Sequence, residues 1–149
     1  MRALFPIVLC GLTALATLRA EPAPPTPAWT HVNLAPAKTS IYFGSVTITT
    51  TPFACTGSTF AGTYVAKVFP WAFWGESGRI SITLPADDLV KLSQCQTVEF
   101  KGEAANQKGK PRKVAGKIQP ADSTSGKIKV RVSADGVELI FNTTFQVSP

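Results

Sequence analysis

The chain has 149 residues, of which 44% are hydrophobic, and its 15 basic and 9 acidic side chains give a formal net charge of +6. This length fits a single domain. The only histidine, His31, lies in a proline-rich segment, so a Ser-His-Asp or Cys-His catalytic arrangement inside the folded domain is excluded.

The first residues, 1–20, have the pattern of a secretory signal peptide. A positive start is followed by an apolar run over 4–18 that is too short to span a membrane as a helix. Small residues permit cleavage after Ala16 or after Ala20, and the abrupt change of composition favours Ala20. We therefore predict an exported protein, secreted or periplasmic, with no transmembrane segment in the mature chain.

A proline-rich segment follows over 21–38 and contains five prolines. Proline has a fixed φ and no backbone N–H, so this segment cannot form a helix and favours extended geometry. We interpret it as a semi-rigid tether, which leaves 39–149 as the antiparallel β domain.

Within 39–149, apolar and polar residues alternate with the period of two that is typical of β-strands. The clearest case is 79–84, where three aliphatic side chains alternate with Arg, Ser and Thr. The alternation changes phase at Gly44-Ser45, which we interpret as a bulge. The predicted strands are 40–50, 59–69, 79–84, 96–102, 113–118, 127–132 and 137–147.

One short helix is predicted over 85–92. Pro85 suits a helix start, and Asp87 and Asp88 favour the positive end of the helix dipole. About seven strands joined by hairpin turns predict an all-β fold. We favour an antiparallel, Ig-like β-sandwich with this one short helix, and a small closed β-barrel is the alternative.

The cysteines and acidic residues offer little chemistry. Cys10 leaves with the signal peptide, so Cys55 and Cys95 remain and predict a disulfide, with two unpaired thiols as the alternative. No residues have the spacing of a metal site or of a phosphate-binding loop, so no metal and no cofactor are expected. Asp87 and Asp88 are adjacent and diverge on a helix, which is unsuited to acid–base catalysis. We do not expect an enzyme.

Positive charge is concentrated over 101–131. This segment contains nine Lys and Arg residues and two acidic residues, Glu103 and Asp122, which gives a local net charge of +7. If strands 113–118 and 127–132 are neighbours with their apolar residues inward, lysines line one outer face. We predict that this face binds a polyanion through counterion release, and an ordinary solvated face is the alternative. The absence of interleaved aromatics weighs against specific nucleic acid recognition. The candidate polyanion-binding residues are Lys108, Lys110, Arg112, Lys113, Lys117, Lys127, Lys129 and Arg131.

Four aromatic residues gather where the strand 59–69 ends: Phe69, Trp71, Phe73 and Trp74. Pro70 interrupts the ladder there, so the chain is expected to leave the sheet. We predict that these side chains form a lid over the end of the core, and a platform for an apolar ligand is the alternative.

The order of signal peptide, strands, short helix and the hairpin VEFKGEAANQKGKPRKVAGKI (98–118) resembles the secreted lipid-binding YceI-like barrels. The resemblance implies, as an alternative, a barrel that carries an apolar, lipid-like ligand. The sequence first predicts an exported, non-catalytic binding or structural β-domain at the cell envelope. Its expected partner is an acidic envelope polymer or another envelope protein.

Overall fold

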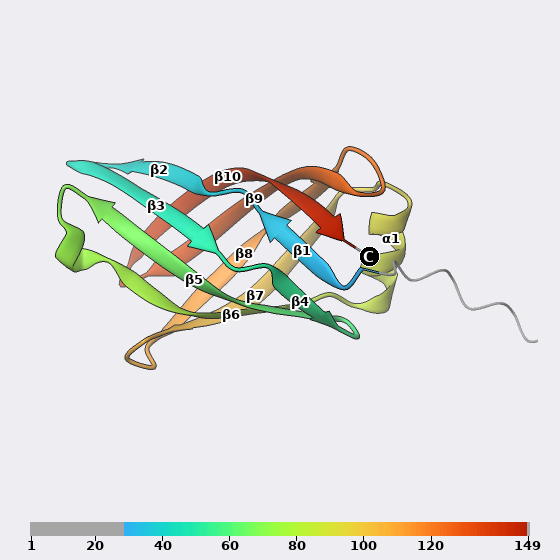
Figure 1. The fold of residues 1–149 in the computed structure, drawn as a ribbon, viewed down its shortest axis with the longest axis horizontal. Helices are drawn as coiled ribbons and strands as arrows, with labels where there is room; N and C mark the ends of the chain where they lie inside the picture. Colours follow the sequence, from blue (N-terminus) through green and yellow to red (C-terminus); the bar gives the residue numbers. More distant parts are fainter. Residues whose placement is uncertain (1–28, 149) are drawn as a thin grey trace, which may run out of the picture.

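The computed structural model describes residues 29–148, and within them the chain is almost entirely β-structure (Figure 1). The predicted signal peptide and the tether up to residue 28 lie outside the described residues. The strands are β1 (His31–Leu34), β2 (Ala37–Ile41), β3 (Gly44–Thr50), β4 (Phe53–Thr56), β5 (Thr59–Phe69), β6 (Glu76–Thr83), β7 (Val98–Asn106), β8 (Pro111–Pro120), β9 (Ser125–Ala134) and β10 (Val137–Ser148). An α-helix, α1 (Ala86–Ser93), follows β6, and a 3-10 helix, η1 (Ala72–Trp74), lies between β5 and β6.

Eight strands close into an antiparallel barrel. Strands β5 to β10 pair in chain order, β10 pairs with β1, β1 pairs with β4, and β4 returns to β5. The β2–β3 hairpin extends the wall, because β3 pairs with the half of β5 that β4 leaves free. The all-β prediction and its barrel alternative are therefore confirmed, and the favoured sandwich is wrong.

The barrel closes through residues 31–34, which were expected to belong to the tether, so the predicted tether boundary is wrong and His31 is part of the folded domain. His31–Leu34 forms β1 and lies between β10 and β4, with Val32 opposite both Val147 and Phe53. Without this strand, β10 and β4 would be the open edges of a sheet. Closure removes those edges and their unpaired backbone groups.

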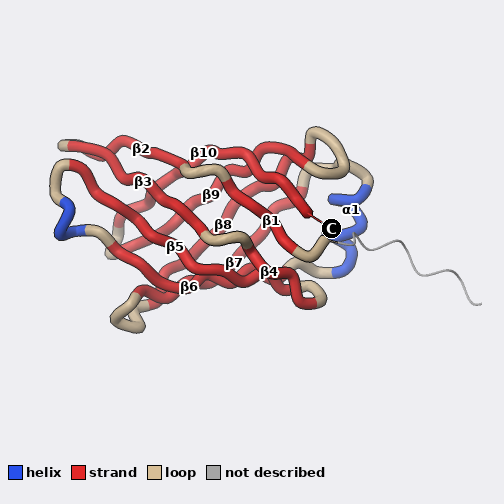
Figure 2. The backbone as a smooth tube through the Cα atoms, in the orientation of Figure 1, coloured by secondary structure: helices blue, strands red, loops and turns tan. Residues whose placement is uncertain are grey.

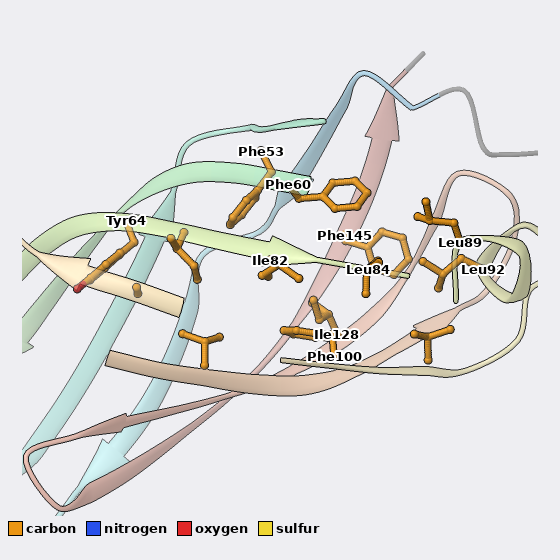
Figure 3. Close-up of a cluster of buried hydrophobic side chains, with 14 residues drawn as sticks. Phe53, Phe60, Tyr64, Ile82, Leu84, Leu89, Leu92, Phe100, Ile128 and Phe145 are labelled. Atoms are coloured by element: carbon orange, nitrogen blue, oxygen red, sulfur yellow. The ribbon is translucent and has the colours of Figure 1, made fainter. Parts of the chain in front are cut away.

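The strand alternation places one apolar face of each strand inside the barrel. The larger core cluster includes Phe60, Phe100, Ile128 and Phe145, which converge on the barrel axis (Figure 3). A second, smaller cluster of Ala37, Val46 and Phe141 fills the part of the interior beside the β2–β3 hairpin.

Helix α1 closes one end of the barrel, opposite η1 (Figure 2). Its Leu89 and Leu92 are buried and lie beside Leu84 at the end of β6 (Figure 3). The acidic Asp87 and Asp88 occupy its first turn, where the helix dipole favours negative charge. The predicted helix is therefore confirmed.

Two local predictions are wrong. The phase change at Gly44 is a tight hairpin, in which Ile41 pairs with Gly44 and Tyr42-Phe43 form the turn, so the chain reverses instead of bulging. Cys55 and Cys95 are both free: Cys55 lies in β4 and its thiol donates to the carbonyl of Gly57 at 3.4 Å. Cys95 is exposed and follows α1 in the chain.

Candidate functional site

The strongest candidate site is an open groove of about 710 Å³ on the outer wall of β7, β8 and β9. It begins at the start of α1, where Pro85 and Asp88 line it, and crosses the three strands. Strands β8 and β9 are neighbours, as the basic-face prediction required, and Lys117 lies directly opposite Lys129.

The strand register arranges the outward side chains of this wall in rows. One row runs Glu99–Lys117–Lys129, and the next runs Lys101–Ala115–Arg131. In the second row the small side chain of Ala115 separates Lys101 from Arg131, which leaves an opening at the centre of the groove. We call Lys101, Lys117, Lys129 and Arg131, gathered around Ala115, the basic groove.

The floor of the basic groove is backbone. A Cβ atom on Gly116 would lie 2.1 Å from the carbonyl oxygen of Lys129 and 2.7 Å from the ring of Phe100. Phe100 packs beneath Gly116 from inside the barrel and is itself buried. A larger residue would clash at position 116, so a glycine is required there. The floor of the groove at this point is therefore the backbone of β8.

The cations of the basic groove are only partly neutralised. Lys117 lies 3.8 Å from Glu99, and Arg131 lies 3.8 Å from Glu138, both at exposed positions where such pairs contribute little. Within residues 29–148, no carboxylate pairs with Lys101 or Lys129. Like charges directly opposite on neighbouring strands are destabilising, so the Lys117–Lys129 pair is unfavourable to the fold itself.

The other predicted basic residues lie around the groove or away from it. Lys127 and Lys113 face outward in the two rows that flank it: Lys127 lies opposite Gln119, and Lys113 lies between Ser133 on β9 and the exposed Glu103 on β7. Lys108 and Lys110 lie at the β7–β8 turn, at the far end of the barrel. Lys101 was not among the predicted residues, although the alternation with Phe100 already placed it on the outer face.

Arg112 does not belong to the outer face, because it lies inside the barrel and is only 7% exposed. Its guanidinium donates to both carboxylate oxygens of Glu76, from Nε at 3.1 Å and from a terminal nitrogen at 2.7 Å. Tyr64 and Asn106 donate to the same carboxylate at 2.6 and 3.2 Å. The alternation of β8 contained this signal, since Arg112 has the same phase as the inward Val114.

These contacts fix the charges of the polar network formed by Tyr64, Glu76, Asn106 and Arg112. The hydrogen bond from Arg112 is the main reason that the pKa of Glu76 falls to about 2. Burial and the bond to Glu76 raise the pKa of Tyr64, so its hydroxyl keeps its proton. The carboxylate of Glu76 accepts a full set of hydrogen bonds, and the network connects β5, β6, β7 and β8 as a structural brace.

The predicted aromatic lid is not a lid. Phe69, Phe73 and Trp74 are exposed, Trp71 is half-buried, and none of the four belongs to either core cluster. Tyr42 and Phe43 in the β2–β3 turn are exposed as well. We call the five exposed residues the aromatic rim; it lies at the end of the barrel opposite α1 (Figure 1).

Two small spaces lie among the side chains of the barrel interior. One cavity of about 50 Å³ lies toward α1 between Trp29 and Phe145, and another of about 40 Å³ lies near Phe141. Ligand sites for small molecules usually measure about 300–1,000 Å³. Both interior spaces are smaller than such a site, whereas the volume of the outer groove falls within that range.

No protein-family model, no curated protein and no solved structure matches the chain significantly, and the resemblance to YceI-like barrels gains no support from family models. Residues 29–148 contain no cluster of three or more His, Cys, Asp or Glu side chains suited to a metal ion. In the same part of the chain, no helix has the length and apolar character needed to cross a bilayer.

Proposed function

We propose that the protein is an exported, non-catalytic binding domain of the cell envelope that holds an acidic polymer in the basic groove. The observation that carries this proposal is the placement of Lys117 directly opposite Lys129, with Lys101 and Arg131 in the next row. An anion bound over Ala115 would offset the repulsion between these cations. The carboxylates of Glu99 and Glu138 offset it only in part.

The arrangement favours a polymer over a single small anion. Outward residues of successive rows are about 7 Å apart along a strand, so the rows from Lys127 to Lys113 extend over about 20 Å. A small anion would touch one or two rows, whereas a chain of phosphate, sulfate or carboxylate groups can contact all of them. Each contact releases counterions and adds to the affinity at low salt.

The side chains of the basic groove favour a saccharide or polyol backbone over nucleic acid. Phe100 is the only aromatic residue that lines the groove, and its ring is turned into the barrel. Binding of single-stranded nucleic acid usually needs aromatic side chains on which bases stack. The groove offers cations on a flat, thin wall, which suits charges that repeat along a flexible chain.

The test is a double substitution, Lys101→Gln with Lys129→Gln, assayed for binding to heparin as a model acidic polymer. Neither lysine has an ion-pair partner within residues 29–148, so the substitution breaks no salt bridge described there. We expect earlier elution in a salt gradient and a slope of log affinity against log salt that is lower by about one per cation removed.

The matched control is Lys38→Gln with Lys67→Gln. These lysines are exposed, flank Thr47 on the β2–β3–β5 wall, and carry the same total charge. If binding reflects only the net charge of the protein, both double variants will weaken it equally, and the basic groove has no special role. Heparin binding that is absent at low salt contradicts the proposal outright.

The alternative function, a carrier of an apolar ligand inside the barrel, has less support. It requires the interior to open well beyond the cavities near Trp29 and Phe141. Native mass spectrometry of protein purified from its own host tests it, because a bound lipid would appear as added mass.

A further inference from the structure

The aromatic rim is formed by two loops that pack against each other. Ser45 pairs with Phe69 across β3 and β5. A Cβ atom on Gly44 would lie 1.9 Å from the carbonyl oxygen of Phe69 and 3.2 Å from the ring of Pro70. The β2–β3 turn and the start of the β5–β6 connection therefore form one continuous surface.

The side chains of this surface project outward instead of filling a space. Tyr42 is fully exposed, and Phe73 and Trp74 are 76% and 58% exposed. Within the β5–β6 connection the rings support one another: Trp74 lies 5.0 Å from Trp71 and 5.5 Å from Phe73, measured between ring centroids. Aromatic side chains that stack laterally while facing solvent present apolar area at low conformational cost, and a contiguous patch of this kind marks an interaction surface.

In β2, β3 and β5, the strands that carry most of the aromatic rim, the charged side chains are Lys38 and Lys67, and both are basic. The acidic Asp135 of the β9–β10 turn, at the same end of the barrel, is paired with Lys110 and Arg112. Lys67 is the only charged residue between Lys38 and Glu76 in the sequence. Lys38 and Lys67 lie in one cross-strand row on either side of Thr47, both exposed. Glu76 is held inside the barrel by Arg112, so it does not offset them. Lys67 lies two residues, or about 7 Å, before Phe69 along β5, and Lys38 lies in the same cross-strand row. If the rings enter a surface, the long side chains of both lysines can reach that surface.

We propose that the aromatic rim is a membrane-docking surface, with which the protein binds an anionic lipid bilayer. Trp and Tyr rings prefer the interface between headgroups and acyl chains, and apolar side chains at such a surface enter it by about 5–10 Å. Lys38 and Lys67 then face the headgroups, where each cation near an anionic surface adds to binding. The basic groove opens on another wall, begins near α1, and stays free in this orientation.

The experiment is co-sedimentation with vesicles of phosphatidylcholine alone and of phosphatidylcholine mixed with phosphatidylglycerol. For this experiment the protein is produced by export through its predicted signal peptide. The intact mass then verifies that the apolar N-terminal segment has been removed and cannot contribute to vesicle binding. We expect binding to the anionic vesicles, with a blue shift of tryptophan emission. Phe73→Ser with Trp74→Ser should weaken that binding by about tenfold or more, because two rings no longer transfer from water.

Ile140→Ser is the matched control, because Ile140 is an exposed apolar residue on the outer face of β10 and belongs to neither loop of the aromatic rim. It should leave vesicle binding unchanged. Lys38→Gln with Lys67→Gln should reduce binding to anionic vesicles but leave any binding to phosphatidylcholine alone as it was.

Three results would overturn the proposal. The first is no binding to anionic vesicles, and the second is binding that the Phe73 and Trp74 substitutions leave intact. The third is self-association of the unmodified protein, detected by sedimentation equilibrium without lipid and abolished by those substitutions, because it would make a second copy the occupant of the rim. Heparin binding by the basic groove is independent of all three outcomes.

Discussion

The two ends of the barrel differ in where their apolar side chains point. At the α1 end, Leu89 and Leu92 turn inward and complete an apolar core. At the other end no helix covers the interior: a polar network around Glu76 braces the strands, and aromatic side chains turn outward. One end therefore serves stability, and the other combines a polar brace with a surface available for contact.

The comparison predicts a large loss of stability at the brace. Arg112→Ala should lower the free energy of unfolding by about 3 kcal/mol, because it leaves the partly buried carboxylate of Glu76 without its main partner and removes a buried side chain. Arg79→Ala, on the outer face of β6, is the matched control and should change it by less than about 0.5 kcal/mol. Urea unfolding measures both; equal effects would mean that the brace is not structural.

The closed end should be comparably sensitive, for a different reason. Leu92 is 1% exposed, so Leu92→Ala should cost about 2–5 kcal/mol through lost burial and the cavity left behind. Because no charge is removed, this loss should be the same at pH 7 and at pH 4. A pH-dependent loss would show that α1 is coupled to the polar network.

Acid should weaken the brace end selectively. The pKa of Glu76 is lowered from 4.5 to about 2, so its contribution to stability is present above about pH 4.5 and is lost as the pH falls toward 2. The difference in unfolding free energy between the unmodified protein and Glu76→Gln should shrink across that range. Tyr64→Phe removes one hydrogen bond to Glu76 and should shift the loss to a slightly higher pH. A constant difference would contradict the assignment.

The smallest effect on stability is expected at the aromatic rim. Phe73→Ser should change the free energy of unfolding by less than about 0.5 kcal/mol, since the side chain is exposed and lies outside the core. Thermal unfolding measures this directly. A loss comparable to that of Leu92→Ala would restore the lid that the sequence first indicated.

Most of the strands were predictable because their alternation is local. Strands β5 and β10 were expected at 59–69 and 137–147, and the inward phase of Phe60, Tyr64 and Phe141 follows from the period of two. The turn residues explain the hairpins: Asp135 and Gly136 both have positive φ between β9 and β10.

What the sequence did not predict depends on long-range pairing. Nothing local to His31–Leu34 shows that it lies between β10 and β4, and this pairing decides between a barrel and a sandwich. The aromatic cluster was misassigned for the same reason, because only the tertiary arrangement decides whether side chains at a strand end cover the core or face solvent. The inward position of Arg112, by contrast, is a local signal, because Arg112 has the same phase in β8 as the buried Val114.

The most direct test of the basic groove is a ¹H–¹⁵N NMR titration of the protein with heparin oligosaccharide. We expect the shift changes to concentrate on the amides of Lys101, Ala115, Gly116 and Lys129, and the amide shifts of Tyr42 and Trp74 to stay unchanged. Shifts spread evenly over all exposed lysines, or centred on the β7–β8 turn at Lys108, would contradict it.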